Sequence, residues 1–366
     1  MQLKTTKAAI FAALSSAAGV AESRSILPIL SNVLIRQDGK KVTFTASDSE
    51  IQSSSIATVD NDGDFAITVN AKKMMDVIRS FSDGAELAIK IDAGKMQIKS
   101  GKSRFNLQTL PADDFPVVAA ETGERMEIKI AASAFASLLK SVQFAAAKND
   151  VRYYLNGVLI RTENGKITAV GTDGHRIAVD SMPVDFALTD NDYILPRKTV
   201  HELIRILGNS EEDLLISFAD NNVIFAFADT VLVSKLIQGK FPDFTRVLPT
   251  GQMFKLSGFR DEILKSMNRA SILANDKFKG IRLVIGNDSL KIVAANTEQE
   301  EATEEIEVNY SGDAIDTGFN VQYITDALAS SQSETVTIGL KDAQSSALIT
   351  FAERPNFKYV VMPMRV

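Results

Sequence analysis

Hydrophobic residues recur along the chain with the spacing of one-sided helices. Met74, Val77, Ile78 and Phe81 follow the i, i+3, i+4, i+7 pattern that brings side chains onto one helix face. Related patterns predict five more helices, around Ile10, Phe11 and Leu14; Phe135, Leu138, Leu139 and Val142; Val200, Leu203, Ile204 and Leu207; Ile263, Met267 and Ala270; and Val321, Ile324 and Leu328. Between these segments, alternating apolar and polar residues predict strands, for example at 87–91, 214–218 and 335–338.

The chain also contains an internal repeat. Val33-Leu34-Ile35-Arg36 recurs 125 residues later as Val158-Leu159-Ile160-Arg161, and a looser copy, Arg282-Leu283-Val284-Ile285, follows at about the same distance. Self-similarity at a fixed period indicates one structural unit present several times. We therefore predict an α+β fold of three similar domains, each with two helices packed on antiparallel sheets.

Each copy of the repeat leads into residues that are typical of tight turns. Asp38-Gly39, Asn164-Gly165 and Asn287-Asp288 stand between apolar runs. Such residues tolerate the positive φ that a two-residue hairpin turn requires. A hairpin is expected at each of the three positions.

Proline and glycine mark the expected joins between the repeats. Pro111 and Pro116 fall near the first join, and Pro242, Pro249 and Gly251 fall near the second. The predicted domains are residues 1–120, 128–243 and 245–366.

Composition excludes several classes of protein. The 366 residues are 45% hydrophobic and 23% charged, which is a globular composition. With no cysteine and two histidines, the chain lacks the means to build a disulfide framework, a thiol nucleophile or a histidine-rich metal site, so no metal and no cofactor are expected. No run approaches the ~20 apolar residues of a membrane span and no signal-peptide pattern opens the sequence, which favours a cytoplasmic protein.

Charge is unevenly distributed along the sequence. The formal net charge is −6, yet five of the six helical segments with their flanking turns are net positive. A surface made of these helices would attract phosphates without reading bases, while the acidic remainder would repel nucleic acid. The pattern favours an interior lined for DNA.

The most enzyme-like segment is Gly171-Thr172-Asp173-Gly174-His175-Arg176. A hydrolase centred on Asp173 and His175 is one alternative, but neither a Gly-x-Ser-x-Gly motif nor a phosphate-binding loop accompanies the pair. A turn or a recognition surface fits these residues better. A second alternative is a static DNA-binding scaffold, which would hold DNA by direct contacts alone.

Three other motifs point to contacts with other molecules. Arg152-Tyr153-Tyr154 combines a cation with aromatic rings, as in surfaces that touch a nucleic-acid backbone or stack on a base. The acidic run from Glu298 to Glu305 suits one half of a charged intersubunit contact. The segment 359–366 is largely apolar to its last residue, so the tail is expected to dock in a groove.

Together these motifs resemble the bacterial DNA polymerase III β subunit family, the sliding clamps, over essentially the full length of the chain. The resemblance rests on 150–157 (DVRYYLNG), 172–176 (TDGHR), 241–244 (FPDF), 246–249 (RVLP), 298–302 (EQEEA), 318–321 (GFNV) and 360–365 (VVMPMR). It implies a non-enzymatic processivity factor, in which two chains of three domains form a closed head-to-tail ring that encircles duplex DNA and tethers a polymerase.

The resemblance also implies three sets of functional residues. A cleft for partner peptides, between the second and third domains, would use Leu155, Thr172, Gly174, His175, Arg176, Ile177, Pro242, Arg246, Val247, Val360, Val361, Met362, Pro363, Met364 and Arg365. The head-to-tail contact would set Lys73, Phe105 and Leu107 of one chain against Ile272, Leu273, Glu298, Glu300 and Glu304 of the other. The residues facing DNA would be Arg24, Arg152, Tyr153, Tyr154, Arg197 and Lys198.

The implied partners are double-stranded DNA, held without sequence preference, the replicative polymerase and the clamp loader. Other polymerases and repair proteins would dock through a short Gln/Leu/Phe-type peptide, and no membrane contact is expected. The chain departs from the family pattern at Ile177 and Val366, where leucine is common, at Thr297, where proline is expected, and at Lys148-Asn149. The first two changes predict a slightly reshaped cleft.

Overall fold

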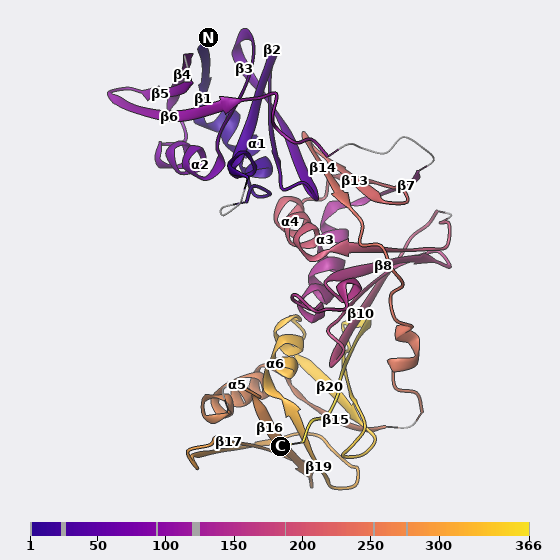
Figure 1. The fold of residues 1–366 in the computed structure, drawn as a ribbon. Coiled ribbons are helices and arrows are strands. Elements are labelled where there is room, and N and C mark those ends of the chain that lie inside the picture. The colour runs from indigo at the N-terminus through magenta and orange to yellow at the C-terminus, as the bar shows by residue number, and fades with distance from the viewer. Residues whose placement is uncertain are drawn as a thin grey trace. The chain divides into compact units, whose positions relative to one another are not determined.

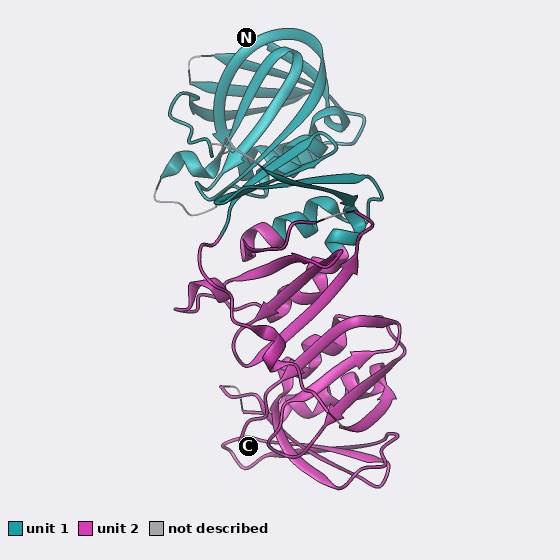
Figure 2. Ribbon diagram, turned by 90° about the vertical axis from the view of Figure 1, so that its right-hand side faces the viewer, with its two compact units in different colours: residues 1–136, 201–236 teal, residues 137–200, 237–366 magenta. Residues whose placement is uncertain are grey.

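The computed structural model describes residues 2–22, 27–92, 94–118, 125–186, 188–251, 253–275 and 277–365. The chain divides into two compact units, shown in Figure 2: unit 1 holds residues 1–136 and 201–236, and unit 2 holds residues 137–200 and 237–366. The strand pairings within both units are antiparallel. The predicted α+β class is therefore confirmed.

All six predicted helices occur in the described part of the chain. They are α1 (Lys7–Ala18), α2 (Ala71–Ser80), α3 (Ala132–Val142), α4 (Arg197–Leu207), α5 (Arg260–Ala270) and α6 (Val321–Ala329). In Figure 1, α1 lies beside α2 and α5 lies beside α6, and α1 and α5 pack on strands of their own repeat. None of the helices among the described residues has the length and apolar run needed to cross a bilayer.

Two helix pairs share a capping device that follows the sequence repeat. Lys7 is the first residue of α1, and its Nζ donates to the carbonyl of Phe81 just beyond α2, at 2.6 Å. Arg260 is the first residue of α5, and its Nη1 donates to the carbonyl of Leu328 near the end of α6, at 3.0 Å. A cation is favoured beside the unpaired carbonyls of a helix C-terminus. In each pair, this cation therefore links the N-terminus of the first helix to the C-terminal end of the second.

Unit 1 contains one ten-stranded sheet, in the order β1-β4-β5-β6-β3-β14-β13-β12-β7, with β2 paired to β3. Its strands are β1 (Gln2–Thr6), β2 (Asn32–Ser47), β3 (Ile51–Asn70), β4 (Glu86–Asp92), β5 (Lys95–Ser100), β6 (Ser103–Pro111), β7 (Met126–Ala131), β12 (Asp213–Phe218), β13 (Asn222–Phe227) and β14 (Thr230–Lys235). The sheet crosses from one repeat to the next, because β14 pairs with β3, with Thr230 opposite Ser55. Ile10, Leu14, Phe44, Met74 and Ile78 lie in the core beneath the first repeat.

Unit 2 contains an eight-stranded sheet, β11-β8-β9-β10-β22-β21-β20-β15, and a four-stranded sheet, β18-β17-β16-β19. The strands are β8 (Gly157–Glu163), β9 (Lys166–Thr172), β10 (Arg176–Pro183), β11 (Asn191–Pro196), β15 (Phe254–Phe259), β16 (Gly280–Gly286), β17 (Ser289–Ala295), β18 (Glu301–Glu307), β19 (Ile315–Asn320), β20 (Thr335–Leu340), β21 (Ala347–Phe351) and β22 (Arg354–Val361). The larger sheet again joins two repeats, because β10 pairs with β22.

The hairpin predictions are confirmed at two of the three positions. Asn164 and Gly165 join β8 to β9 with φ of 49° and 68°, and Asn287 and Asp288 join β16 to β17 with φ of 49° and 57°. The prediction at Asp38-Gly39 was wrong, because both residues lie within β2, which is one continuous strand of 16 residues.

Gly39 has a positive φ of 56°, but it serves a bulge in the pairing of β2 with β3. Gly39 lies opposite Gly63 while Lys41 lies opposite Thr58, so the register shifts there without a reversal of the chain. A bulge and a tight turn both need a residue that tolerates positive φ, and the local sequence does not distinguish them.

Candidate functional site

A pocket of about 210 Å³ opens in unit 2 where the second and third repeats meet. It is lined by Arg152, Tyr154, Leu155, Thr172, Gly174, His175, Arg176, Ile177, Phe241, Pro242, Phe244, Val247, Val360 and Met362. Leu155, Ile177, Phe241, Phe244 and Val360 also belong to the hydrophobic core that the two repeats share. The pocket is thus the place where this core reaches the surface, which is the usual character of a ligand site.

The C-terminal tail forms one side of the pocket. In the ladder between β10 and β22, Ile177 lies opposite Val360. Beyond the ladder, the Met362 N–H donates to the His175 carbonyl at 2.9 Å, and the Met364 N–H donates to the Gly318 carbonyl at 2.8 Å. The tail is docked by its backbone, as expected, and leaves the Met362 side chain 48% exposed at the pocket.

The adjoining part of the pocket wall is formed by a turn that Asp173 organises. The Asp173 Oδ1 accepts the backbone N–H groups of His175 at 3.0 Å and Arg176 at 3.2 Å. The Thr172 hydroxyl donates to the Arg176 carbonyl at 2.6 Å, which closes the turn. Asp173 therefore serves as a turn residue bonded to the backbone and to Arg176, which is a different arrangement from an acid–base pair with the His175 ring.

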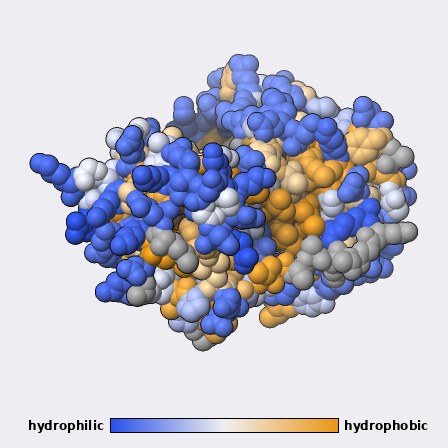
Figure 3. All heavy atoms as spheres, turned by 90° about the horizontal axis from the view of Figure 1, so that it is seen from above, coloured by the Kyte–Doolittle hydropathy of each residue, from blue (hydrophilic) through white to orange (hydrophobic). Residues whose placement is uncertain are grey.

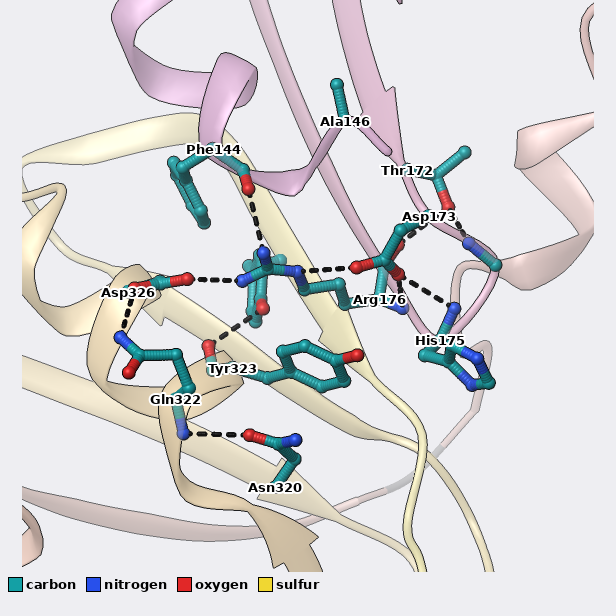
Figure 4. A network of polar contacts seen from close by, with 12 residues as sticks. Phe144, Ala146, Thr172, Asp173, His175, Arg176, Asn320, Gln322, Tyr323 and Asp326 are labelled. Carbon is teal, nitrogen blue, oxygen red and sulfur yellow. Dashed lines mark hydrogen bonds and ion pairs between the residues drawn. The ribbon is translucent and has the colours of Figure 1, made fainter. Parts of the chain in front are cut away.

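Arg176 lies at the centre of a polar network behind this turn, shown in Figure 4. Its Nε donates to the Asp173 Oδ2 at 3.0 Å, its Nη1 to the Asp326 Oδ2 at 2.6 Å, and its Nη2 to the Phe144 carbonyl at 2.8 Å. The ring of Tyr323 lies 4.5 Å from the guanidinium carbon. The side chain is 10% exposed, so its charge is enclosed by partners from both repeats.

Arg176 keeps its charge despite its burial, because two carboxylates face it. Burial works to lower the pKa of Arg176, but its interactions with Tyr359, Asp326 and Asp173 outweigh burial and raise that pKa. Burial also raises the pKa of Tyr359, whose hydroxyl donates to the Tyr323 carbonyl at 2.8 Å. The arginine is therefore permanently charged and the tyrosine permanently neutral across the physiological range.

A second ion pair lies at the rim of the pocket. Arg152 donates to the Asp150 carboxylate through Nε at 3.0 Å and Nη2 at 2.9 Å, and this hydrogen bonding lowers the pKa of Asp150 to about 2. The Arg152 Nη2 also donates to the Asp173 carbonyl at 3.2 Å. Its guanidinium lies over Gly174, where a Cβ would come within 2.9 Å of Nη2.

Ten of the fifteen residues predicted for the cleft line this pocket, and five lie outside the lining. Val361 is buried in β22, and the Arg246 side chain is 85% exposed and paired with Asp243 at 2.9 Å. The other three are Pro363, Met364 and Arg365. Sequence reasoning missed Phe241 and Phe244, although the apolar spacing of Phe241-Pro242-Asp243-Phe244 was a usable signal.

The residues predicted to face DNA have varied surroundings. Arg152 and Tyr154 line the pocket, and Tyr153 is 58% exposed with its ring against Gly239. Arg197 begins α4 and donates from Nη1 to the Ala146 carbonyl at 2.8 Å; burial, and then the charge of Arg176, lowers its pKa. Lys198 is half-buried on the same helix, and Arg24 lies outside the described residues.

The residues predicted for the head-to-tail contact fall into two groups. In unit 1, Lys73 is exposed on α2, and Phe105 and Leu107 are half-buried on β6, with Phe105 meeting Phe81 edge to face at 5.7 Å. In unit 2, Ile272 is 76% exposed, Leu273 is half-buried, and Glu298 and Glu300 are exposed. Glu304 already receives a hydrogen bond from the Arg269 Nε of its own chain, at 2.9 Å.

Other large hydrophobic side chains of unit 1 are also exposed. The face shown in Figure 3 is mostly hydrophilic, with its broadest hydrophobic region right of the centre of the view. Large exposed hydrophobic side chains in unit 1 include Ile56, Leu110 and Val231. Unit 1 therefore has apolar surface available for contacts beyond its own core.

A close backbone approach just before the pocket turn gives a stability prediction. At Gly171 in β9, a Cβ would lie 2.3 Å from the Val142 carbonyl oxygen, which belongs to the backbone. Gly171→Ala is expected to reduce the free energy of unfolding by about 1–3 kcal/mol, because the backbone has to shift to make room. Gly84→Ala is the control, since no atom of the described chain beyond the adjacent residues lies within 4 Å of its Cβ position. Equal melting temperatures for the two variants in scanning calorimetry would contradict the prediction.

Comparison with known proteins identifies the family. Family models of the DNA polymerase III beta subunit match the chain in three parts: the N-terminal domain at residues 1–119, the central domain at 129–243 and the C-terminal domain at 245–365. The chain is 39% identical over 368 residues to the beta sliding clamp of Pseudomonas aeruginosa, covering 100% of both chains. It is 40% identical over 354 residues to the beta sliding clamp of Escherichia coli K12, covering 96% of both.

Solved structures agree with these relatives. The crystal structure of the Pseudomonas aeruginosa DNA polymerase III subunit beta matches with a TM-score of 0.93 at 38% identity, and the solved structure of Caulobacter crescentus pol III beta matches with a TM-score of 0.90 at 32% identity. Each match covers 100% of both chains.

Three like domains of this architecture define a DNA sliding clamp, a non-catalytic processivity factor. The chain belongs to the DNA polymerase III beta subunit family. The prediction of a sliding clamp is confirmed, and the alternatives of a hydrolase centred on Asp173 and His175 and of a static scaffold are set aside.

Proposed function

We propose that two copies of this chain close head to tail into a ring around duplex DNA, and that the pocket in unit 2 docks short peptides from the polymerase and the clamp loader. Each copy supplies three domains, residues 1–120, 128–243 and 245–366, as half of the ring. The ring acts in the cytoplasm, where its proposed partners work.

The pattern of strand pairing between repeats carries the dimer proposal. The third repeat has four strands between its helices, β16 to β19, and the second has β8 to β11. The first repeat has two long strands, β2 and β3, in place of these four. The tetrapeptide at 33–36 lies at the start of β2, and its copy at 158–161 lies in β8. β2 therefore corresponds to β8 and β9, and β3 corresponds to β10 and β11. The first half of β3, β10 and β18 are therefore equivalent strands.

Each equivalent strand that has a following repeat pairs with the last strand of that repeat. The first half of β3 pairs with β14, and β10 pairs with β22. In the described part of the chain, β18 pairs only with β17, and residues 103–108 of β6, the last strand of the first repeat, pair only with β5. If the same pairing extends between copies, β18 of one copy pairs with β6, the last strand of the first repeat, of another copy. Two such contacts close a symmetric dimer.

Charge and apolar residues at these edges support the same pairing. β18 carries four glutamates (EATEEIE), and Lys102 and Arg104 lie at the start of β6. Such charges contribute more to orientation and partner choice than to affinity. Phe105, Leu107, Ile272 and Leu273 supply apolar area beside the edges.

The pocket supports the peptide-docking proposal. Its lining combines fixed apolar side chains with Met362, whose flexible thioether adapts to different partners. A peptide with a Gln followed by Leu and Phe would bury its aliphatic and aromatic anchors there, and such anchors are often worth ~2 kcal/mol or more each. Clamps from Pseudomonas aeruginosa and Bartonella birtlesii have been crystallised bound to griselimycin.

DNA is proposed to be held by enclosure, with few direct contacts from Arg24, Arg152, Tyr153, Tyr154, Arg197 and Lys198. A protein that neutralises several phosphates loses affinity with a slope of about −0.9 per phosphate in log K against log salt. A small number of contacts therefore suits a ring that has to slide.

The encirclement is tested with DNA of different topology. A ring loaded by a clamp loader onto nicked circular DNA is expected to remain bound at raised salt and to be lost when the circle is linearised, as measured by gel filtration of labelled protein with DNA. Binding without the loader should be weak and salt-sensitive. Equal loss from circular and linear DNA would refute enclosure and support static contacts.

A further inference from the structure

The turn at 172–176 separates two cavities of opposite character. On one side is the pocket of about 210 Å³, whose lining is mostly apolar. On the other is a polar cavity of about 560 Å³, lined by Phe144, Ala146, Ala147, Lys148, Asp150, Asp173, His175, Arg176, Arg197, Tyr323 and Asp326. His175 and Arg176 line both cavities.

Arg176 lies between the two cavities, and its guanidinium makes its hydrogen bonds on the polar side. The guanidinium donates to Asp173, Asp326 and the Phe144 carbonyl, and Figure 4 shows it between the two carboxylates. The arginine contributes to the pocket wall, while its hydrogen-bond donors point to partners outside the pocket lining. A guanidinium turned toward the pocket would bring a charge to a mostly apolar surface whose described lining residues include no carboxylate.

Asp326 is the partner that comes from the other repeat. It lies on α6, 150 residues beyond Arg176 in the sequence, and it does not belong to the pocket lining. Its second oxygen, Oδ1, accepts from the Gln322 Nε2 at 2.7 Å, which fixes the carboxylate on its helix. Asp326 thus holds Arg176 from a rigid element outside the pocket.

We infer that Asp326 is a positioning and specificity-determining residue of the pocket: it holds the Arg176 guanidinium on the polar side of the turn and so keeps the pocket selective for apolar peptide anchors. The inference rests on the proposed function, since it concerns which peptides the pocket accepts. It assigns Arg176 a place in the pocket wall and gives it no direct ion pair with the ligand.

The matched control is a second buried ion pair that joins the same two repeats. The Arg354 Nη2 donates to the Asp180 Oδ2 at 2.6 Å, and the Asp180 side chain is 13% exposed. Asp180 lies on β10 and Arg354 on β22, toward the end of that ladder away from Arg176, and neither residue lines the pocket. Asp180→Asn therefore removes one carboxylate charge from the same junction without touching the Arg176 network.

The first experiment measures binding of a fluorescein-labelled peptide containing Gln, Leu and Phe to the full-length protein by fluorescence anisotropy. Asp326→Asn is expected to weaken binding about tenfold, within the range by which packed networks modulate a site. Asp180→Asn is expected to stay within about twofold of the unchanged protein. A second probe with Glu in place of Leu tests selectivity: Asp326→Asn should narrow the preference for the Leu probe, and Asp180→Asn should not.

A ligand-free readout separates this inference from the proposed function. In a protein labelled with ¹³C at its methionine methyl groups, Asp326→Asn is expected to shift the NMR signal of Met362, and Asp180→Asn is expected to leave it unchanged. If the unchanged protein fails to bind the Leu probe while Met362 shifts, the docking proposal fails and the positioning role stands. Equal effects of the two variants on affinity and on Met362, or no effect of Asp326→Asn on either, would overturn the inference.

Discussion

Replacing Ile272 and Leu273 with alanine is expected to convert the dimer into a monomer at micromolar protein concentration. Both residues lie in the short 3₁₀ helix Ser271–Leu273, which contacts β18, the open edge of the third repeat. Ile272 is 76% exposed in the isolated chain, so it gains its packing only when a partner covers the edge. Truncating a buried aliphatic side chain costs about 2–5 kcal/mol, and a two-fold ring contains the contact twice.

Sedimentation velocity of the double variant measures this effect directly. Phe259→Ala is the matched control, because Phe259 is 59% exposed in the same repeat but lies at the opposite end of α5. It should sediment as the unchanged protein does. A double variant that still sediments as a dimer would mean that β18 and β6 are not the surfaces that join the copies.

Deleting Met362 to Val366 is expected to abolish peptide binding and polymerase processivity while leaving the dimer intact. The deletion removes the Met362 side chain from the pocket and two backbone hydrogen bonds, to His175 and Gly318, that hold the tail. Val360 and Val361 remain in the ladder with β10, so the sheet that joins the repeats persists. The effect should therefore be confined to the pocket.

Calorimetric titration of the Leu-containing probe into the truncated dimer tests the second result. The control is Phe259→Ala, which changes an exposed side chain outside the pocket lining and should bind the probe with nearly unchanged affinity. If the longer deletion binds the probe as tightly as the full chain, the pocket in unit 2 is not the docking site.

Local sequence information accounts for the elements of this fold. The six helices were predictable because the spacing of apolar residues that indicates each helix lies wholly within that segment of the sequence. The turns at Asn164-Gly165 and Asn287-Asp288 were predictable because these residues accept positive φ. The failure at Asp38-Gly39 has the same origin, because a bulge within a long strand needs the same backbone conformation as a turn. The repeat itself predicted three like domains, since it requires only comparison of the chain with itself.

The candidate site was only partly predictable from the sequence. The motifs around Leu155, Thr172 and Met362 marked the pocket through their resemblance to the sliding clamps, and the structure brings these residues together. Arg152 and Tyr154, which are proposed to contact DNA, also line this pocket. The sequence did not show this pocket role, because it depends on how the segment around residues 152–155 packs against the distant residues 241–247 and 360–362.

By itself, the sequence determined the helices, the three repeats, the family and the absence of cysteine chemistry, because each of these depends on residue type and spacing along the chain. The tertiary structure alone decided that β14 joins β3 and that β22 joins β10, and that, among the described residues, β18 and residues 103–108 of β6 each keep one unpaired edge. It also decided that Arg176 meets Asp326 from 150 residues away. The physical reason is that strand partners and buried ion pairs are selected by packing between distant segments, and strands with similar patterns of apolar residues do not reveal from their own sequence which neighbour they will bind.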